Sequence, residues 1–132
     1  MRVRMNNDLL RCIAITDDDI DWVEAILHIK FDQRRRDIIK NMDTIDIQAF
    51  PGSGKTTVLV AKLAILAKKW PSPNCGICVL SHTNAARDEI ERRLGNTEVG
   101  KKLLCFPHFI GTFHSFFDTF VAIPSLPILI LM

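Results

Sequence analysis

The stretch Ala49-Phe50-Pro51-Gly52-Ser53-Gly54-Lys55-Thr56-Thr57 decides how this sequence is interpreted. It follows a short run that alternates apolar and polar residues, and it opens a long run of helical character. This is the strand, glycine-rich loop and helix context of a phosphate-binding loop. Two glycines flank a serine, so the backbone can curl until successive N–H groups point at a phosphate. We therefore predict a nucleoside triphosphate site in this stretch.

The residues after the glycines supply the charge and the metal ligand of such a site. Lys55 offers a mobile positive charge to the outer phosphates, and Thr56 offers a hydroxyl to a magnesium ion. The helix that begins here adds the positive end of its dipole. The pattern departs from GxxxxGK[ST] at one position, because Ala49 stands where the first glycine would be. The predicted phosphate-binding residues are Pro51, Gly52, Ser53, Gly54, Lys55, Thr56 and Thr57, with Mg²⁺ on Thr56.

Length and composition are those of a soluble globular protein with one domain. The 132 residues are 48% hydrophobic and 24% charged, and the formal net charge of +2 is too small to indicate nucleic-acid binding by itself. The first residues have no signal-peptide pattern, and no apolar run is long enough to span a bilayer. We expect a cytoplasmic location without a membrane partner.

Four cysteines occur, at positions 12, 75, 78 and 105. Cys75 and Cys78 have CxxC spacing, but the other two are isolated, so no second pair completes a zinc site. The apolar neighbours of the CxxC pair predict that both cysteines lie on or beside a buried strand. Their reduced form fits a cytoplasmic setting.

Helices and strands are expected to alternate around the loop, which predicts the α/β fold class. Thr16 should cap a helix of about three turns, and Asp32 a second short helix that Asn41 ends. Residues 44–49 alternate apolar and polar side chains and should form a strand. The helix after the loop should connect this strand to the next one in a right-handed parallel βαβ unit. The later elements are expected to be a buried helix at 57–69, a strand at 76–80, a polar helix at 84–94, a linking stretch at 96–108, a strand at 109–113 and an aromatic-rich helix at 114–122.

The C-terminal residues 123–132 are apolar, carry no charge and contain two prolines. They are too short to span a membrane and too apolar for an exposed tail. They could form a buried strand or be the scar of a truncated or frame-shifted reading frame. We favour truncation, because the motifs described next are incomplete.

Besides the loop at 49–57, three further stretches at 31–35, 80–90 and 110–116 carry distinctive residues. In this order the four stretches resemble UvrD/Rep-type superfamily 1 DNA helicases. Residues 49–57 are similar to the Walker A loop of that family, in which alanine is common at the first position. Residues 80–90 (Leu-Ser-His-Thr-Asn-Ala-Ala-Arg-Asp-Glu-Ile) look like motif Ia, and residues 110–116 (Ile-Gly-Thr-Phe-His-Ser-Phe) look like motif Ib. Residues 31–35 (Phe-Asp-Gln-Arg-Arg) resemble the Q motif. Together the matches extend over most of the chain.

The resemblance implies ATP as the nucleotide, with Lys55 and Thr56 as the catalytic residues of the loop. Gln33 would pair with the edge of the adenine, since its amide both donates and accepts hydrogen bonds. The simpler explanation is a surface glutamine on a short helix.

The resemblance also implies single-stranded DNA as a partner. Thr83 and Asn84 follow a strand and start a helix, where they could hold a DNA phosphate, although plain helix capping would also explain them. Thr112 and His114 lie at the end of a strand, where ligand sites of open α/β sheets gather. The phenylalanines of this region are assigned to the core.

The family also has motifs that this sequence lacks. A working motor needs a Walker B aspartate and a neighbouring glutamate, but the acidic runs at 17–19 and 88–89 do not follow an apolar strand in the right place. The chain thus resembles the opening part of a first motor domain, unable to hydrolyse ATP or unwind DNA by itself. We divide it into a helical lead-in with the Q-motif-like segment at 1–42, a partial, incomplete RecA-like P-loop domain at 43–122 and the apolar tail at 123–132.

Two other classes of protein remain open. A small P-loop kinase or nucleotide-binding module would need an arginine-bearing lid and has no use for the motifs at 83–86 and 111–114. A non-catalytic remnant or interaction protein would dock on a partner through the apolar tail.

Overall fold

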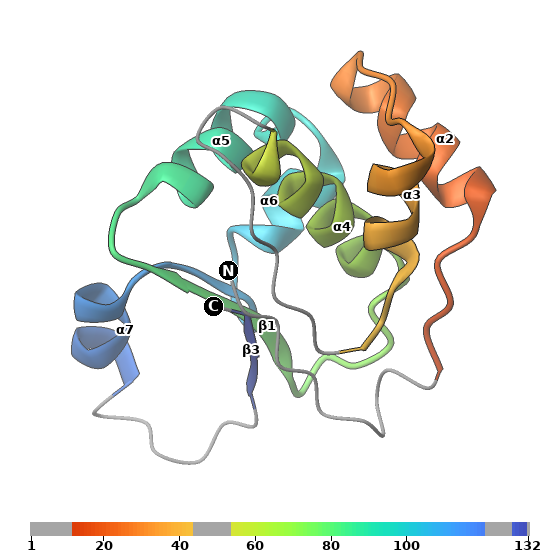
Figure 1. The fold of residues 1–132 in the computed structure, drawn as a ribbon. Helices are drawn as coiled ribbons and strands as arrows, with labels where there is room; N and C mark the ends of the chain where they lie inside the picture. The colour runs from red at the N-terminus through yellow and green to blue at the C-terminus, as the bar shows by residue number, and fades with distance from the viewer. Residues whose placement is uncertain (1–11, 44–53, 121–127, 132) are drawn as a thin grey trace.

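The computed structural model describes residues 12–43, 54–120 and 128–131. The expected strand at 44–49 and the loop residues Pro51, Gly52 and Ser53 lie outside these ranges. Figure 1 shows a group of helices on one side of a small sheet, with the last helix set apart from them beside the sheet. In chain order the elements are α2 (Asp17–Leu27), α3 (Gln33–Lys40), α4 (Lys55–Lys69), β1 (Gly76–Ser81), α5 (Ala85–Leu94), α6 (Glu98–Leu103), β2 (Phe109–Thr112), α7 (Phe113–Phe120) and β3 (Ile128–Leu131).

Within the described residues, the sheet has three parallel strands in the order β2-β1-β3. The central strand β1 pairs Val79 with Ile110 of β2 and Ile77 with Leu129 of β3. Parallel neighbours need a crossover, and α5 and α6 provide it between β1 and β2. The α/β class and the strands expected at 76–80 and 109–113 are therefore confirmed. The apolar tail was open to two interpretations, and four of its residues form β3.

Helix α4 is the centre of the core. All of its residues from 58 to 67 are buried, as expected for a helix that is apolar on nearly every side. It packs against α2, α3, α5 and α6. The predicted buried helix is confirmed, and it begins two residues earlier than expected.

One lysine interrupts the apolar surface of α4. Lys62 is 5% exposed, and its ammonium donates to the carbonyls of Ile38 (3.5 Å) and Asn41, at the C-terminal end of α3. Cations are favoured at that end of a helix dipole. Burial lowers the pKa of Lys62 to about 8. This buried contact fixes α3 against α4.

The predicted helix caps before the loop are confirmed. Thr16 caps α2 in a capping box, in which the Asp19 carboxylate accepts from the Thr16 N–H at 2.9 Å. Asp32 caps α3 by accepting from the Arg35 N–H at 2.8 Å, and Asn41 ends that helix. These caps fix the residues at which α2 and α3 begin.

A buried carboxylate stabilises the connection between α2 and α3. Glu24 is 2% exposed and accepts from the Phe31 N–H (2.8 Å), from Arg36 (2.8 Å) and from Lys30 (3.0 Å). Burial raises the pKa of Glu24, but the Phe31 N–H and the two cations outweigh it, so the pKa lies below its ordinary value. The carboxylate therefore stays charged and fixes the chain as it enters α3.

Residues 96–108 are more ordered than the sequence predicts. Glu98–Leu103 form α6, capped by Thr97, whose hydroxyl accepts from the Gly100 N–H at 3.0 Å. A Cβ on Gly100 would lie 1.9 Å from the Leu94 carbonyl oxygen, so only glycine allows this close contact. Leu103 is fully buried. The structure of this linking stretch could not be predicted from the sequence, and part of it is a helix too short to be stable without tertiary packing.

The start of β1 is held by a buried histidine. His108 accepts from the Ile77 N–H through Nδ1 at 3.0 Å, and its ring lies edge-on to Trp70 at 5.7 Å. The Trp70 indole donates to the Cys75 carbonyl at 2.8 Å. Cys75 and Cys78 are both buried, which confirms their predicted place on or beside a buried strand; burial raises the pKa of the Cys78 thiol to about 12.

Acid should destabilise the fold through His108. Burial, and secondarily Lys102, lowers the pKa of His108 from 6.5 to about 4. Because the folded-state pKa lies below the unfolded one, the stabilisation is complete above pH 6.5 and is lost as the pH falls toward 4. Between about pH 7.5 and about pH 5 the free energy of unfolding should fall by about 2 kcal/mol through this group.

Urea unfolding at the two pH values measures the effect. His108→Asn is the control, since its side-chain oxygen can still accept from the Ile77 N–H but does not titrate. An equal loss of stability in both proteins would rule out His108 as the cause.

Candidate functional site

The first turn of α4 has the backbone that an anion site requires. Gly54 precedes the helix with φ 83°, a left-handed conformation that favours glycine. Its carbonyl accepts from the Val58 N–H at 3.0 Å, which closes the first helical turn. Helix geometry leaves the N–H groups of Lys55, Thr56 and Thr57 without a partner inside the helix. That turn contains no acidic residue, so the positive end of the dipole is not offset there.

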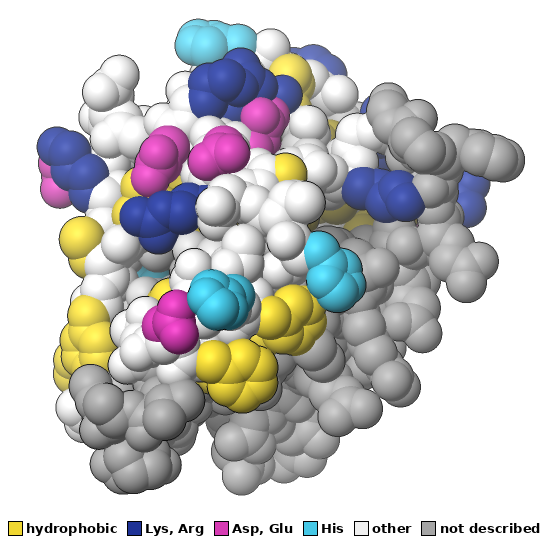
Figure 2. Space-filling model, turned by 90° about the vertical axis from the view of Figure 1, so that its left-hand side faces the viewer, with side chains coloured by type: hydrophobic (Ala, Val, Ile, Leu, Met, Phe, Trp, Pro, Cys, Tyr) yellow, Lys and Arg dark blue, Asp and Glu magenta, His cyan; other side chains and the backbone are white. Residues whose placement is uncertain are grey.

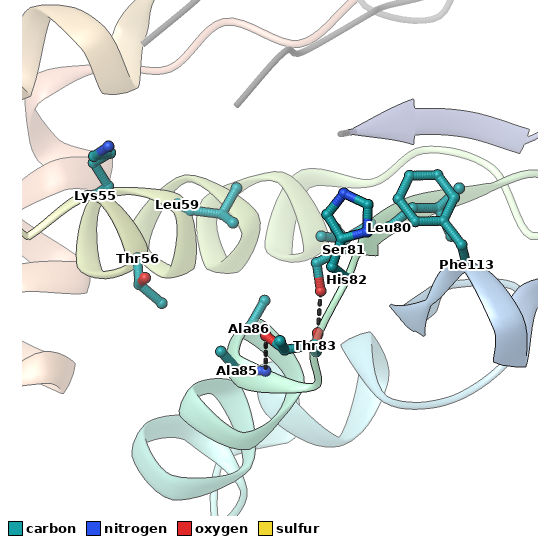
Figure 3. A pocket seen from close by; sticks show the side chains of 11 residues that line it. Lys55, Thr56, Leu59, Leu80, Ser81, His82, Thr83, Ala85, Ala86 and Phe113 are labelled. Atoms are coloured by element: carbon teal, nitrogen blue, oxygen red, sulfur yellow. Dashed lines mark hydrogen bonds between the residues drawn. The ribbon is translucent and has the colours of Figure 1, made fainter. Parts of the chain in front are cut away.

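A cavity of about 450 Å³ opens between this turn and the carboxyl end of β1 (Figure 3). Ligands of open α/β sheets collect at the carboxyl ends of the strands. In Figure 3, Lys55 and Thr56 project from α4 in different directions. The lining residues are Lys55, Thr56 and Leu59 of α4, Val79, Leu80 and Ser81 of β1, His82 and Thr83 of the following turn, Ala85 and Ala86 of α5, and Phe113 of α7.

The structure brings together three of the predicted site residues. Lys55, Thr56 and Thr83 line the same cavity, although Thr83 follows the next strand along the chain. Gln33 lies elsewhere, on α3, where its amide nitrogen donates to Asp37 at 2.9 Å on the exposed face of that helix. The prediction that Gln33 meets the nucleotide is not tested by this arrangement.

Thr83 and Asn84 are both exposed and precede α5. The Ser81 hydroxyl donates to the Thr83 carbonyl, and the Thr83 hydroxyl accepts from the Ala85 N–H at 3.4 Å. Asn84 occupies the cap position without a side-chain capping bond. Capping thus explains Thr83 in part and does not explain the side chain of Asn84.

Thr112 and His114 stand at the junction of β2 and α7. The Thr112 hydroxyl accepts from the Ser115 N–H at 3.1 Å and donates to the Ser115 hydroxyl at 3.0 Å. The His114 side chain is 90% exposed, and its Nε2 lies 3.3 Å from an Asp118 carboxylate oxygen. Neither residue lines the cavity, and Thr112 already has a local structural role.

The phenylalanines of this region were assigned to the core, and for Phe117 this is corrected. Phe117 is 60% exposed, while Phe113 and Phe116 are half-buried. The cause is that α7 meets the sheet on one side and contacts β2 and β1. Figure 2 shows apolar side chains next to histidines on this face. Phe113 also lies 5.5 Å from the His82 ring at the cavity, a pairing that the sequence spacing does not reveal.

The described residues contain no group of three or more His, Cys, Asp or Glu side chains that could hold a metal ion. Within those same ranges, no helix has the length and apolar character needed to cross a membrane.

The comparison with known protein families matches residues 31–122 to the UvrD/REP helicase N-terminal domain. The chain therefore belongs to this family, and the resemblance inferred from the four ordered motifs is confirmed.

Three curated proteins are similar to parts of this chain. Gabija protein GajB of Bacillus cereus (strain VD045) is 37% identical over 90 residues, which are 68% of this chain and 17% of that protein. ATP-dependent DNA helicase SRS2 of Saccharomyces cerevisiae is 30% identical over 94 residues, 71% of this chain and 8% of that protein. ATP-dependent DNA helicase srs2 of Schizosaccharomyces pombe is 41% identical over 73 residues, 52% of this chain and 8% of that protein. The chain spans a small part of each of these proteins.

Substitutions of Gly54 test its left-handed conformation through the stability of the protein. Gly54→Ala should lower the free energy of unfolding by about 1–2 kcal/mol, the cost of placing a Cβ in this conformation. A Cβ at Gly54 would meet its nearest neighbour at an ordinary 3.8 Å, so the loss would come from backbone strain. Gly54→Asn is the matched control and should lose less, because asparagine tolerates the left-handed region better. A higher free energy of unfolding in urea for Gly54→Ala than for Gly54→Asn would contradict the left-handed conformation of Gly54.

Proposed function

We propose that this chain is the ATP-binding and DNA-binding N-terminal part of a UvrD-like ATP-dependent DNA helicase. One observation carries the proposal. Lys55 and Thr56, in the first turn of a buried helix that follows a left-handed glycine, line one cavity with Thr83 at the carboxyl end of β1. The residues that would hold phosphate and the first residue that would hold DNA are thus neighbours in space.

The residues at the start of α4 fit a nucleotide phosphate. The N–H groups of the first turn and the Lys55 ammonium would hold the outer phosphates, and the loop residues Pro51, Gly52 and Ser53 would complete the contacts. Thr56 would hold Mg²⁺ through its hydroxyl, and the ion would neutralise charge on the phosphates when bound. Gln33 would reach the adenine edge.

The same reasoning assigns single-stranded DNA to the exposed polar residues beyond β1 and β2. Thr83 and Asn84 precede α5, and Thr112 and His114 precede or begin α7. Hydroxyl, amide and imidazole groups at such positions can contact a DNA backbone without reading its sequence. SRS2, whose name describes an ATP-dependent DNA helicase, supports DNA as a partner by similarity.

The proposal includes a limit on the chemistry. The sequence has no aspartate-glutamate pair directly after an apolar strand, which a motor uses to hold magnesium and orient the attacking water. We therefore propose a partial RecA-like P-loop domain at 43–122 that binds ATP with little hydrolysis by itself. A small nucleotide-binding module of another class would bind ATP equally well but would not bind single-stranded DNA.

Calorimetry with MgATP tests the proposal on the purified chain. Lys55→Ala should weaken ATP binding by about tenfold or more, since it removes a charge-assisted contact to phosphate. Lys101→Ala is the matched control: this lysine, on α6, has a 62% exposed side chain paired with Glu98, and its loss should leave ATP affinity unchanged. Equal affinities of the two variants would contradict the site.

Fluorescence anisotropy with a labelled single-stranded oligonucleotide then distinguishes the helicase part from a nucleotide-binding module of another class. Absence of DNA binding by a chain that binds ATP would favour the nucleotide-binding module.

A further inference from the structure

Helix α3 carries three successive arginines with different surroundings. Arg36 is engaged by the acidic face of α2, with one guanidinium nitrogen 2.7 Å from an Asp21 oxygen and 2.8 Å from a Glu24 oxygen. Arg34 is exposed. Arg35 leans toward α4, and its Nη2 would lie 3.8 Å from a Cβ built on Gly54. One guanidinium of the three therefore lies directly beside the phosphate-binding turn.

This position of Arg35 is held from both ends of α3. At the N-terminal end, one Asp32 oxygen accepts from the Arg35 N–H, and the other lies 3.6 Å from the Arg35 guanidinium. At the C-terminal end, the buried Lys62 of α4 donates to the Ile38 and Asn41 carbonyls. The helix that presents Arg35 is thus fixed against the helix that presents Gly54.

The charges at this point favour a polyvalent anion. The Arg35 guanidinium lies beside Gly54, at the positive end of the α4 dipole, Lys55 is the next residue in the chain, and the first turn of α4 has no acidic residue. Asp32 partners Arg35, but its side chain is 61% exposed and that of Arg35 is 42% exposed. An exposed ion pair contributes little, whereas a guanidinium binds phosphate through two parallel hydrogen bonds.

We propose that Arg35 is a further triphosphate-binding residue, which reaches the phosphates from α3 beside Gly54. The inference rests on the proposed nucleotide function and adds to it a cation from outside the loop. Arg35 then helps the site distinguish a nucleoside triphosphate from a nucleoside, because its contact is to phosphate alone.

Binding measurements on the purified chain test the role of Arg35. MgATP, inorganic triphosphate with Mg²⁺, and adenosine are titrated into the wild type, Arg35→Gln and Arg34→Gln, the last being the matched loss of charge one residue away. Arg35→Gln should weaken ATP and inorganic triphosphate by about tenfold and leave adenosine unchanged. Arg34→Gln should leave all three unchanged. Circular dichroism of the ligand-free proteins verifies the fold, and Arg35→Lys, which keeps the charge but loses the two-pronged contact, should bind triphosphate with an affinity between those of the wild type and Arg35→Gln.

The outcomes separate this inference from the function on which it rests. Equal triphosphate affinities of Arg35→Gln and Arg34→Gln would overturn the role of Arg35 alone. Equal losses for ATP and adenosine would also overturn it, because they would indicate a structural role. If Arg35→Gln does not fold, wild-type triphosphate affinity in Arg35→Lys would overturn it as well. Failure of the wild type to bind ATP or triphosphate would contradict the nucleotide site itself, and this inference with it.

Discussion

The enclosure of α4 by apolar packing is the constraint on which the rest of the structure depends. Residues 58–67 of this helix are buried in succession, so four other helices must cover it. Burial of that many apolar side chains is the main favourable term in folding a domain of this size. The cover extends over residues 58–67, while Thr56 in the first turn is exposed and Gly54 before it is left-handed. The proposed phosphate-binding turn is therefore the less buried end of a buried helix.

The two ends of α4 differ in their electrostatic partners. At the C-terminal end the Lys102 ammonium donates to the Ala67 carbonyl at 2.8 Å, a cation where the helix dipole favours one. At the N-terminal end lie Lys55 and the Arg35 guanidinium, which is paired with Asp32. The C-terminal end of the dipole thus has a cationic partner within the protein. The N-terminal end is the one at which we propose that an anionic ligand binds.

The sequence predicted those elements whose signals are local. Thr16 and Asp32 are short polar residues placed directly before helical apolar patterns, which is typical of helix caps. The apolar run after Gly76 is short and follows a loop, which favours a buried strand over a helix. Residues 96–108 gave no such signal, because α6 is short and has a glycine in its middle that serves contact with the Leu94 backbone. Propensity cannot reveal a helix that neighbours stabilise.

The candidate site was predictable in its parts and not in its arrangement. Lys55, Thr56 and Thr83 were identified from motif patterns, and the cavity that joins them follows from the parallel sheet. The exposure of Phe117 and the neighbourhood of Arg35 and Gly54 depend on how α7 and α3 pack, which no local pattern encodes. Likewise, buried ionisable groups such as Lys62 and His108 look like surface residues in the sequence, because their partners are distant in the chain.

The central claim is that the start of α4 is the phosphate-binding part of a nucleotide site. Backbone amide NMR spectra of the ¹⁵N-labelled chain, recorded with and without MgATP, test it residue by residue. We expect the largest shifts on the amides of Gly54, Lys55, Thr56 and Thr57, since phosphate oxygens accept hydrogen bonds from N–H groups at a helix start. Spectra in which these four amides stay in place while others move, or in which nothing moves at saturating MgATP, would contradict it.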